Sequence, residues 1–166
     1  TFAKTTYAPL PLKFEAGTPN FIAQASLAPA LEFAQSLREG EIARVIEAEE
    51  RKIIAYLKEE LQKIEGCTVY GLGWMQQEGA EEPLWGAPGS KIPLFSFNIE
   101  GCFPSDLAQL LDKMGVAVRT GLMCCEPLMA RFGVTSMVRA SFLPYNTLQE
   151  AEYFVASLQR AVRMLR

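Results

Sequence analysis

The sequence contains no histidine in its 166 residues. Histidine is the most common general base in enzymes and the most common metal ligand, so its absence narrows the available chemistry. The cysteines also lack the Cys-x-x-Cys spacing of structural zinc sites. We therefore expect no metal site. Acid–base chemistry would depend on Lys, Tyr or Glu, on a cofactor, or on another chain.

Long apolar runs and basic clusters are absent as well. The apolar runs are far shorter than the ~20 residues that span a bilayer, and the N-terminus lacks the pattern of a signal peptide. The net charge is −3 and no cluster of Lys and Arg stands out, which argues against nucleic-acid binding. We expect a cytoplasmic protein that contacts neither membranes nor nucleic acids.

The composition is that of a globular domain, with 49% hydrophobic and 21% charged residues. Hydrophobic periodicity predicts helices over 21–37, 41–65, 104–114 and 148–165, with Pro29 kinking or dividing the first of them. It predicts strands over 68–70, 92–99, 116–119 and 137–143. Residues 1–20 read as irregular, and a loop near residues 71–90 carries Trp74 and Trp85. The pattern indicates an α/β fold in two layers, a small sheet of about four strands with helices on one side.

The segment from Arg119 to Met129 carries the most distinctive chemistry. Gly121 follows a predicted strand and permits backbone angles closed to other residues. Two adjacent cysteines, Cys124 and Cys125, come next, and we expect Pro127 to exclude helix directly after them. Because a nearby cation such as Arg119 favours the nucleophilic thiolate, Cys124 is a candidate nucleophile, although one sequence does not say which of the two thiols reacts.

The other cysteines and Arg139 have alternative interpretations. Cys67 and Cys102 flank strand ends, where free cysteines are usually small buried apolar residues. Arg139 lies between apolar residues on a predicted strand, and a partly buried arginine needs an anionic partner. That partner is either Glu126 or a carboxylate of the last helix, or else a ligand carboxylate. The residues alone favour the structural partner.

Five segments together resemble the C-terminal portion of SUF-type cysteine desulfurases. These are pyridoxal-phosphate enzymes of the class-V aminotransferase group, related to selenocysteine lyases. The segments, in the order of the family, are Phe14-Glu-Ala-Gly-Thr-Pro-Asn20, Ala117-Val-Arg-Thr-Gly121 followed by Cys124, Pro127-Leu-Met129, Val138-Arg-Ala-Ser141 and Tyr145-Asn-Thr147. The resemblance covers nearly the whole chain.

The resemblance implies a role for four residues. Cys124 matches the catalytic cysteine, which takes the sulfur of L-cysteine as a persulfide and leaves L-alanine for product. Arg139 matches the arginine that binds the substrate carboxylate, which reverses the preference for a structural partner, and Arg119 matches an arginine near the substrate. Thr18 matches a threonine that reaches the cofactor phosphate of the neighbouring subunit in a homodimer. The sulfur would pass to a small acceptor protein for iron–sulfur cluster assembly.

The sequence departs from the family at two places. Leu122, Met123 and Cys125 stand where the family commonly has two histidines and an alanine around the cysteine. The family's cofactor-binding lysine follows a histidine in a preceding domain, and no lysine here has that context; Lys91, for example, opens a predicted strand.

We therefore expect residues 1–20 to be an irregular connector or dimer-interface segment. Residues 21–166 would be the small domain of a larger enzyme, the parent enzyme, whose lysine-bearing domain is absent here. The isolated chain would then be inactive. Two alternatives stay open: a selenocysteine lyase of the same group, and a non-catalytic binding or scaffold domain.

Overall fold

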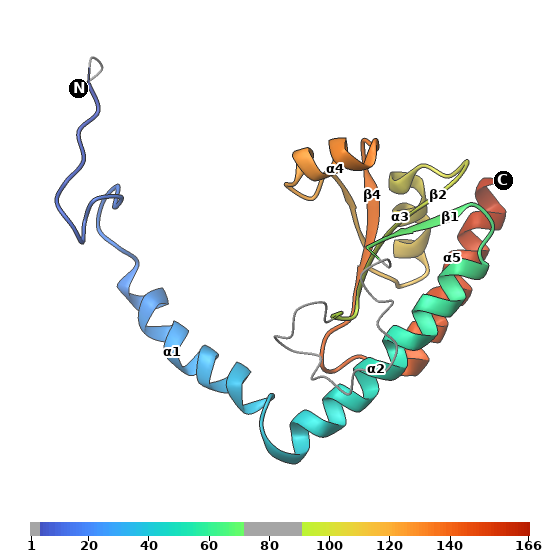
Figure 1. The fold of residues 1–166 in the computed structure, drawn as a ribbon, viewed down its shortest axis with the longest axis horizontal. Helices are drawn as coiled ribbons and strands as arrows, with labels where there is room; N and C mark the ends of the chain where they lie inside the picture. Colours follow the sequence, from blue (N-terminus) through green and yellow to red (C-terminus); the bar gives the residue numbers. More distant parts are fainter. Residues whose placement is uncertain (1–3, 72–90) are drawn as a thin grey trace. The chain divides into compact units, whose positions relative to one another are not determined.

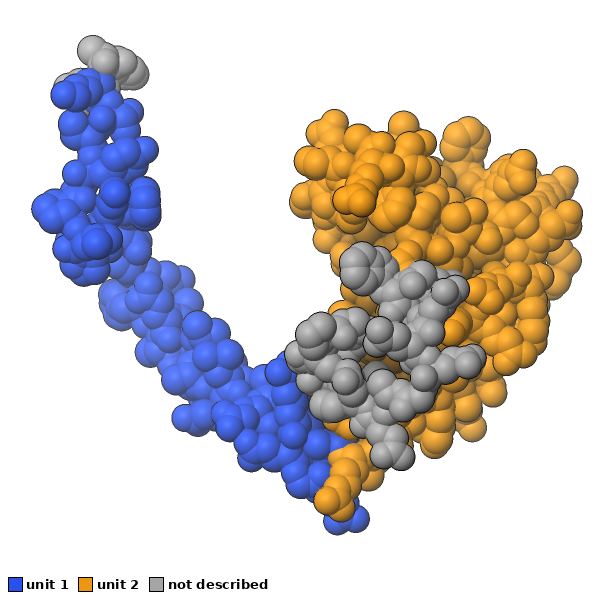
Figure 2. All heavy atoms as spheres, in the orientation of Figure 1, with its two compact units in different colours: residues 1–43 blue, residues 44–166 orange. Residues whose placement is uncertain are grey.

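The computed structural model describes residues 4–71 and 91–166. The chain divides into two compact units, unit 1 (Thr1–Ala43) and unit 2 (Arg44–Arg166), which Figure 2 shows in different colours. The predicted loop with Trp74 and Trp85 lies outside the described residues. None of the helices in the described ranges combines the length and hydropathy needed to cross a bilayer.

Unit 1 consists of an irregular segment followed by helix α1 (Phe21–Ser36). Asn20 caps the helix, because its side-chain oxygen accepts a hydrogen bond of 3.1 Å from the Ala23 N–H. The helix runs through Pro29 without being divided there. No residue of α1 is buried within the described structure, so its apolar side chains are exposed.

Unit 2 is built on an antiparallel sheet of four strands (Figure 1). The strands are β1 (Cys67–Tyr70), β2 (Leu94–Ile99), β3 (Arg119–Gly121) and β4 (Met137–Ser141). Their spatial order is β1-β2-β4-β3, and each neighbouring pair is antiparallel. The predicted α/β fold with a small sheet is confirmed.

The core lies on one face of this sheet. Strand β2 buries Phe95, Phe97 and Ile99, while the alternating residues between them are only half-buried. Val138 and Ala140 of β4 lie opposite Phe97 and Phe95 and share their face. Helices α2 (Gly40–Lys63), α3 (Pro104–Lys113) and α5 (Leu148–Leu165) contribute the rest of the apolar cluster. The prediction that these helices cover one side of the sheet is correct (Figure 1).

Helix α5 begins at the predicted capping box. The Thr147 hydroxyl accepts a hydrogen bond from the Glu150 N–H, and the Glu150 carboxylate accepts one of 2.8 Å from the Thr147 N–H. This reciprocal pair satisfies two backbone donors that the helix itself leaves free.

The prediction that Pro127 excludes helix is wrong. Pro127 lies in the first turn of a short helix, α4 (Glu126–Phe132), where proline is tolerated because the first backbone N–H groups have no partner within the helix. The Phe132 ring lies 4.9 Å from the Tyr70 ring. Tyr70 is paired with Ser96, so α4 contacts the face of the sheet opposite the core.

The third strand also differs from its prediction. The sequence pattern placed a strand over residues 116–119, whereas β3 begins only at Arg119 and continues to Gly121. Val116 and Val118 are half-buried against the core without pairing to another strand. Their alternation reflects packing on the core rather than sheet pairing.

Glu50 is a charged residue within the buried part of α2. It is 2% exposed, and neither carboxylate oxygen has a hydrogen-bond partner among the described residues. Burial, and secondarily the nearby Glu47, raise the pKa of Glu50 above its ordinary value. The folded protein therefore holds this proton more tightly than the unfolded chain does.

We predict that Glu50→Gln stabilises the protein progressively as pH rises. Because the pKa of Glu50 is raised on folding, the wild-type protein loses stability as pH rises above about 4.5 and toward the folded pKa, whereas the amide does not titrate. In thermal melts across this range, the melting temperature of Glu50→Gln minus that of the wild type should increase with pH.

Glu49→Gln is the matched control. The Leu148 N–H donates to Glu49 at 2.9 Å, and together with Lys52 this lowers the pKa of Glu49. Its contribution is present above the ordinary pKa and is lost only in acid, so Glu49→Gln should lower the melting temperature by a nearly constant amount above about pH 5. A constant difference for Glu50→Gln as well would contradict the prediction.

Candidate active site

One row of side chains crosses the face of the sheet opposite the core. Tyr70 pairs with Ser96, Ser96 with Arg139, and Arg139 with Arg119. Residues that lie opposite each other on neighbouring strands project to the same face. The structure therefore brings together the two arginines that the sequence proposed for the substrate, and we call them the arginine pair.

Arg139 is half-buried and lacks an anionic partner in the described part of the chain. Its Nε is fully buried and makes no hydrogen bond there. Neither Glu126 nor a carboxylate of α5 is among the ion pairs that the described residues form. A buried donor without an acceptor costs about 1–3 kcal/mol, and a bound carboxylate would remove that cost.

Arg119 connects Arg139 to residues 122–125, which lie between β3 and α4 and which we call the cysteine loop. It lies directly opposite Arg139, and two like charges in such a position repel each other unless an anion screens them. Its guanidinium also donates a hydrogen bond to the Cys124 sulfur at 3.6 Å. Arg119 is thus positioned to contact both a bound anion and the thiol.

The cysteine loop has an unusual backbone. Met123 and Cys124 have φ angles of 54° and 60°, the left-handed region that is strained for residues other than glycine. Gly121 before them has φ 104°, as its position in the sequence led us to expect. Strained residues of this kind often mark functional sites.

The two adjacent thiols have different surroundings. Cys124 is exposed and receives the hydrogen bond from Arg119, whereas Cys125 is half-buried and donates from its sulfur to the Leu122 carbonyl at 3.3 Å. The sequence left open which thiol reacts. Exposure and the adjacent cation favour Cys124.

The remaining cysteines lie away from this site. Cys102 is buried in the core cluster, and Cys67 is half-buried at the start of β1. Burial raises the pKa of the Cys67 thiol to about 11, so at neutral pH it stays protonated and unreactive.

Thr18, the residue proposed for the cofactor phosphate, belongs to unit 1 and is exposed. The arginine pair and the two adjacent cysteines all belong to unit 2. No group of three or more His, Cys, Asp or Glu in the described ranges could hold a metal ion.

Sequence reasoning missed the polar neighbours of the arginine pair. Asn98 donates to the Ser136 carbonyl at 3.0 Å, and its own carbonyl oxygen is buried without a partner among the described residues. Ser96 and Tyr70 extend the same row. The signal was present in β2, where polar Ser96 and Asn98 alternate with buried aromatic residues.

The family model Aminotransferase class-V matches residues 1–154 of the chain. The chain belongs to the class-V aminotransferases. Among curated proteins, this class-V chain is 38% identical over 165 residues to a "Probable cysteine desulfurase" of Xylella fastidiosa, covering 99% of the chain and 35% of that relative. It is 35% identical over 161 residues to a cysteine desulfurase of Pectobacterium carotovorum, covering 97% of the chain and 35% of the relative.

The solved structures that resemble this chain include cysteine desulfurases, like the curated relatives. A cysteine desulfurase of Escherichia coli superimposes with a TM-score of 0.70 at 31% identity, over 100% of this chain and 36% of the other. A cysteine desulfurase of Thermococcus onnurineus gives a TM-score of 0.68 at 29% identity, over 99% and 36%. The class-V chain thus spans about a third of the length of these relatives.

We predict that Arg119→Ala slows alkylation of Cys124 in this class-V chain. Iodoacetamide reacts with the Cys124 sulfur, and the variant removes the guanidinium that donates a hydrogen bond to this sulfur at 3.6 Å. The rate at Cys124, mapped by mass spectrometry at neutral pH, should fall several-fold.

The other cysteines provide internal controls for this measurement. In the unmodified chain Cys124 should react first, with Cys67 and Cys102 nearly inert. An Arg131→Ala variant, which removes an exposed arginine of α4, should leave the Cys124 rate unchanged. Equal rates of Cys124 alkylation in the Arg119→Ala variant and the wild type would show that Arg119 does not activate the thiol.

Proposed function

We propose that the chain supplies the nucleophile and the substrate-carboxylate site of a cysteine desulfurase. The observation that carries this proposal is the position of Arg119, which lies opposite Arg139 and also donates to Cys124. A carboxylate held by the arginine pair would therefore lie beside the thiol. Because the chain spans only about 35% of its relatives' length, the activity belongs to the longer parent enzyme.

The chain's residues have distinct roles in this reaction. The arginine pair binds the carboxylate of L-cysteine and orients its sulfur toward Cys124. The Cys124 thiolate attacks that sulfur, a sulfur–sulfur bond forms, and the carbon–sulfur bond of the substrate breaks. The bonding electrons stay with the carbon, which takes up a proton to give L-alanine, and Cys124 carries the persulfide. Pyridoxal phosphate, when bound, supplies the electron sink for this bond cleavage.

The described residues fit the substrate better than they fit the whole cofactor. The buried Arg139 Nε without an acceptor suits a carboxylate. No lysine of the sequence follows a histidine, since the chain has none, so we propose that the cofactor-binding lysine lies elsewhere in the parent enzyme. Thr18 would contact the cofactor phosphate of the neighbouring subunit. The 166-residue chain alone would then show no turnover.

We further propose that residues 1–20 form a connector or dimer-interface segment and that residues 21–166 form the small domain. The exposed apolar side chains of unit 1 support a covered position in a homodimeric parent enzyme. A cytoplasmic parent would pass its persulfide sulfur to a small acceptor protein for iron–sulfur cluster assembly, in line with the SUF-type resemblance.

We predict that the parent enzyme with Cys124→Ser binds pyridoxal phosphate but forms no persulfide. A serine hydroxyl lacks the nucleophilic sulfur, while the cofactor site is left intact. The absorbance of the bound cofactor and mass spectrometry of the protein after addition of L-cysteine measure the two properties. Cys125→Ser is the matched control and should retain the persulfide on Cys124. Persulfide formation in the Cys124 variant would refute the assignment.

We predict that Arg139→Ala lowers kcat/KM for L-cysteine in the parent enzyme on the order of 100-fold, because a charge-assisted contact to the substrate carboxylate is lost. The alkylation rate of Cys124 should stay near that of the wild type, since Arg119 remains in place. Arg163→Ala, on the helical side of the sheet, should leave both quantities unchanged. An unaltered kcat/KM in Arg139→Ala would remove Arg139 from the substrate site.

A further inference from the structure

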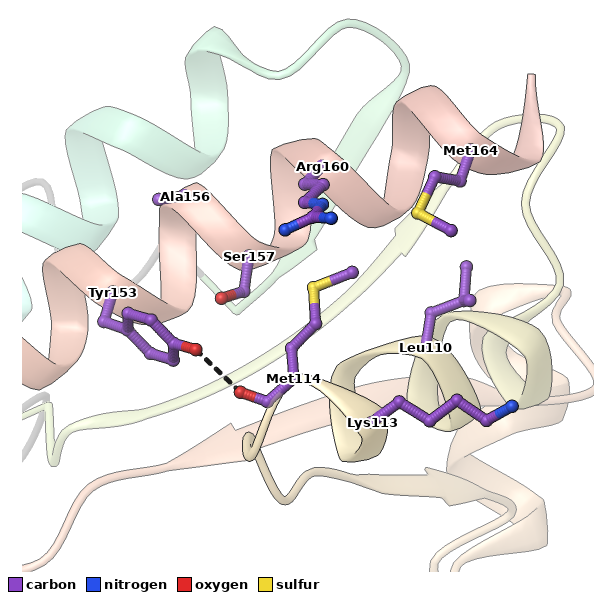
Figure 3. A pocket seen from close by; sticks show the side chains of 8 residues that line it. All are labelled: Leu110, Lys113, Met114, Tyr153, Ala156, Ser157, Arg160 and Met164. Carbon is purple, nitrogen blue, oxygen red and sulfur yellow. Dashed lines mark hydrogen bonds between the residues drawn. The ribbon is translucent and has the colours of Figure 1, made fainter.

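A groove lies between α3 and α5, on the side of the sheet that carries the core. Its volume is about 480 Å³, a size typical of binding sites. Figure 3 shows the side chains around it, which come from both helices. The lining residues are Leu110, Lys113, Met114, Tyr153, Ala156, Ser157, Arg160 and Met164. None of them belongs to the arginine pair or the cysteine loop.

The buried part of the groove combines the polar Ser157 with apolar, adaptable side chains. Leu110 and Met114 are half-buried against the core, and Met164 is 58% exposed at one end. Methionine side chains are flexible and polarisable, and they are common on surfaces that accept partners of varied shape. At the other end the Tyr153 hydroxyl donates to the Met114 carbonyl at 2.8 Å (Figure 3), which ties the two helices together.

The charged residues of the groove are both cations. Lys113 comes from α3 and Arg160 from α5 (Figure 3), and no carboxylate lines the groove. Neither cation takes part in an ion pair with the described residues. The chain as a whole carries a net charge of −3, so the groove is a locally positive site on an acidic protein. Its electrostatic complement is an anionic ligand.

The shape and the chemistry together favour one kind of occupant. A trough between two packed helices suits a third helix, whose apolar side chains at i, i+3, i+4 and i+7 fill the floor. Acidic side chains on its flanks would reach Lys113 on one side and Arg160 on the other. Because neither cation forms an ion pair with the described residues, both remain available to the carboxylates of a partner. We propose that this groove docks an acidic amphipathic helix of a partner protein.

The probe for this proposal is a synthetic peptide of about three helical turns. It carries leucine at i, i+3, i+4 and i+7 and glutamate on the flanks, and a second peptide replaces every glutamate with lysine. Fluorescence anisotropy should show the acidic peptide binding at least about tenfold more tightly than the basic one. Methyl NMR signals of Met114 and Met164 should shift on binding, which locates the peptide in the unmodified protein.

The charge contribution is tested by reversing one arginine. Arg160→Glu should lower the affinity of the protein for the acidic peptide about tenfold. Arg163→Glu makes the same change of net charge on the same helix, outside the groove lining, and should change the affinity less than about twofold. Equal weakening by both variants, equal affinity for both peptides, or methyl shifts elsewhere would overturn the proposal. So would a stronger response to vesicles of anionic phospholipid, because a membrane surface would then be the partner.

A second experiment asks whether the rest of the parent enzyme fills the groove. Ala156 is exposed in the groove lining, and Ala156→Cys in the full-length parent enzyme should be modified by a maleimide as readily as in the 166-residue chain. Protection in the parent enzyme would overturn the proposal, because a segment of the same polypeptide would then occupy the groove. Mass spectrometry maps the maleimide adduct in the groove separately from any adduct on Cys124. The outcomes of both experiments are therefore separate from the outcome of the test of the desulfurase assignment.

Discussion

The structure of unit 2 depends on the two-residue period of β2 and β4. In β2 the aromatic residues Phe95 and Phe97 face the helices, and Ser96 between them faces away. In β4 the same period buries Val138 and turns Arg139 to the opposite face. A shift of the pairing by one residue would bury a guanidinium in the apolar cluster and expose a valine. The stability of the core and the position of Arg139, the arginine proposed to bind the substrate, therefore arise from one register.

Several features near Cys124 are unfavourable for stability when considered alone. Arg119 and Arg139 lie opposite each other, the Arg139 Nε is buried without a partner among the described residues, and Met123 and Cys124 are left-handed. Such features persist only where the surroundings enforce them. Here β3 pairs with β4 on one side of the loop and α4 begins directly after it. A bound carboxylate would offset the first two costs, which is why these defects support a binding site.

The elements that the sequence predicted well depend on local signals. The period of α2 and the capping box at Thr147 act within a few residues, so they can be read without knowing what packs against them. Helix α4 was missed because Pro127 excludes helix from most positions but not from the first turn. The opposition of Arg119 and Arg139 depends on strand register, which hydrophobic alternation in β3 did not reveal. Choosing between the two thiols required the exposure of each and the position of the Arg119 guanidinium.

The absence of histidine changes how a thiol can be activated in this chain. In many enzymes a histidine beside the cysteine gains or loses its charge between about pH 5 and 8, so activation itself depends on pH. Arginine stays charged throughout that range, and Arg119 is the cation that donates to the Cys124 sulfur. Leu122 and Met123, which precede Cys124, are apolar and do not titrate. In the proposed reaction the same fixed charge would serve the nucleophile and the bound carboxylate, and any proton that moves would come from Lys, Tyr or Glu side chains, from the substrate or the cofactor, or from the rest of the parent enzyme.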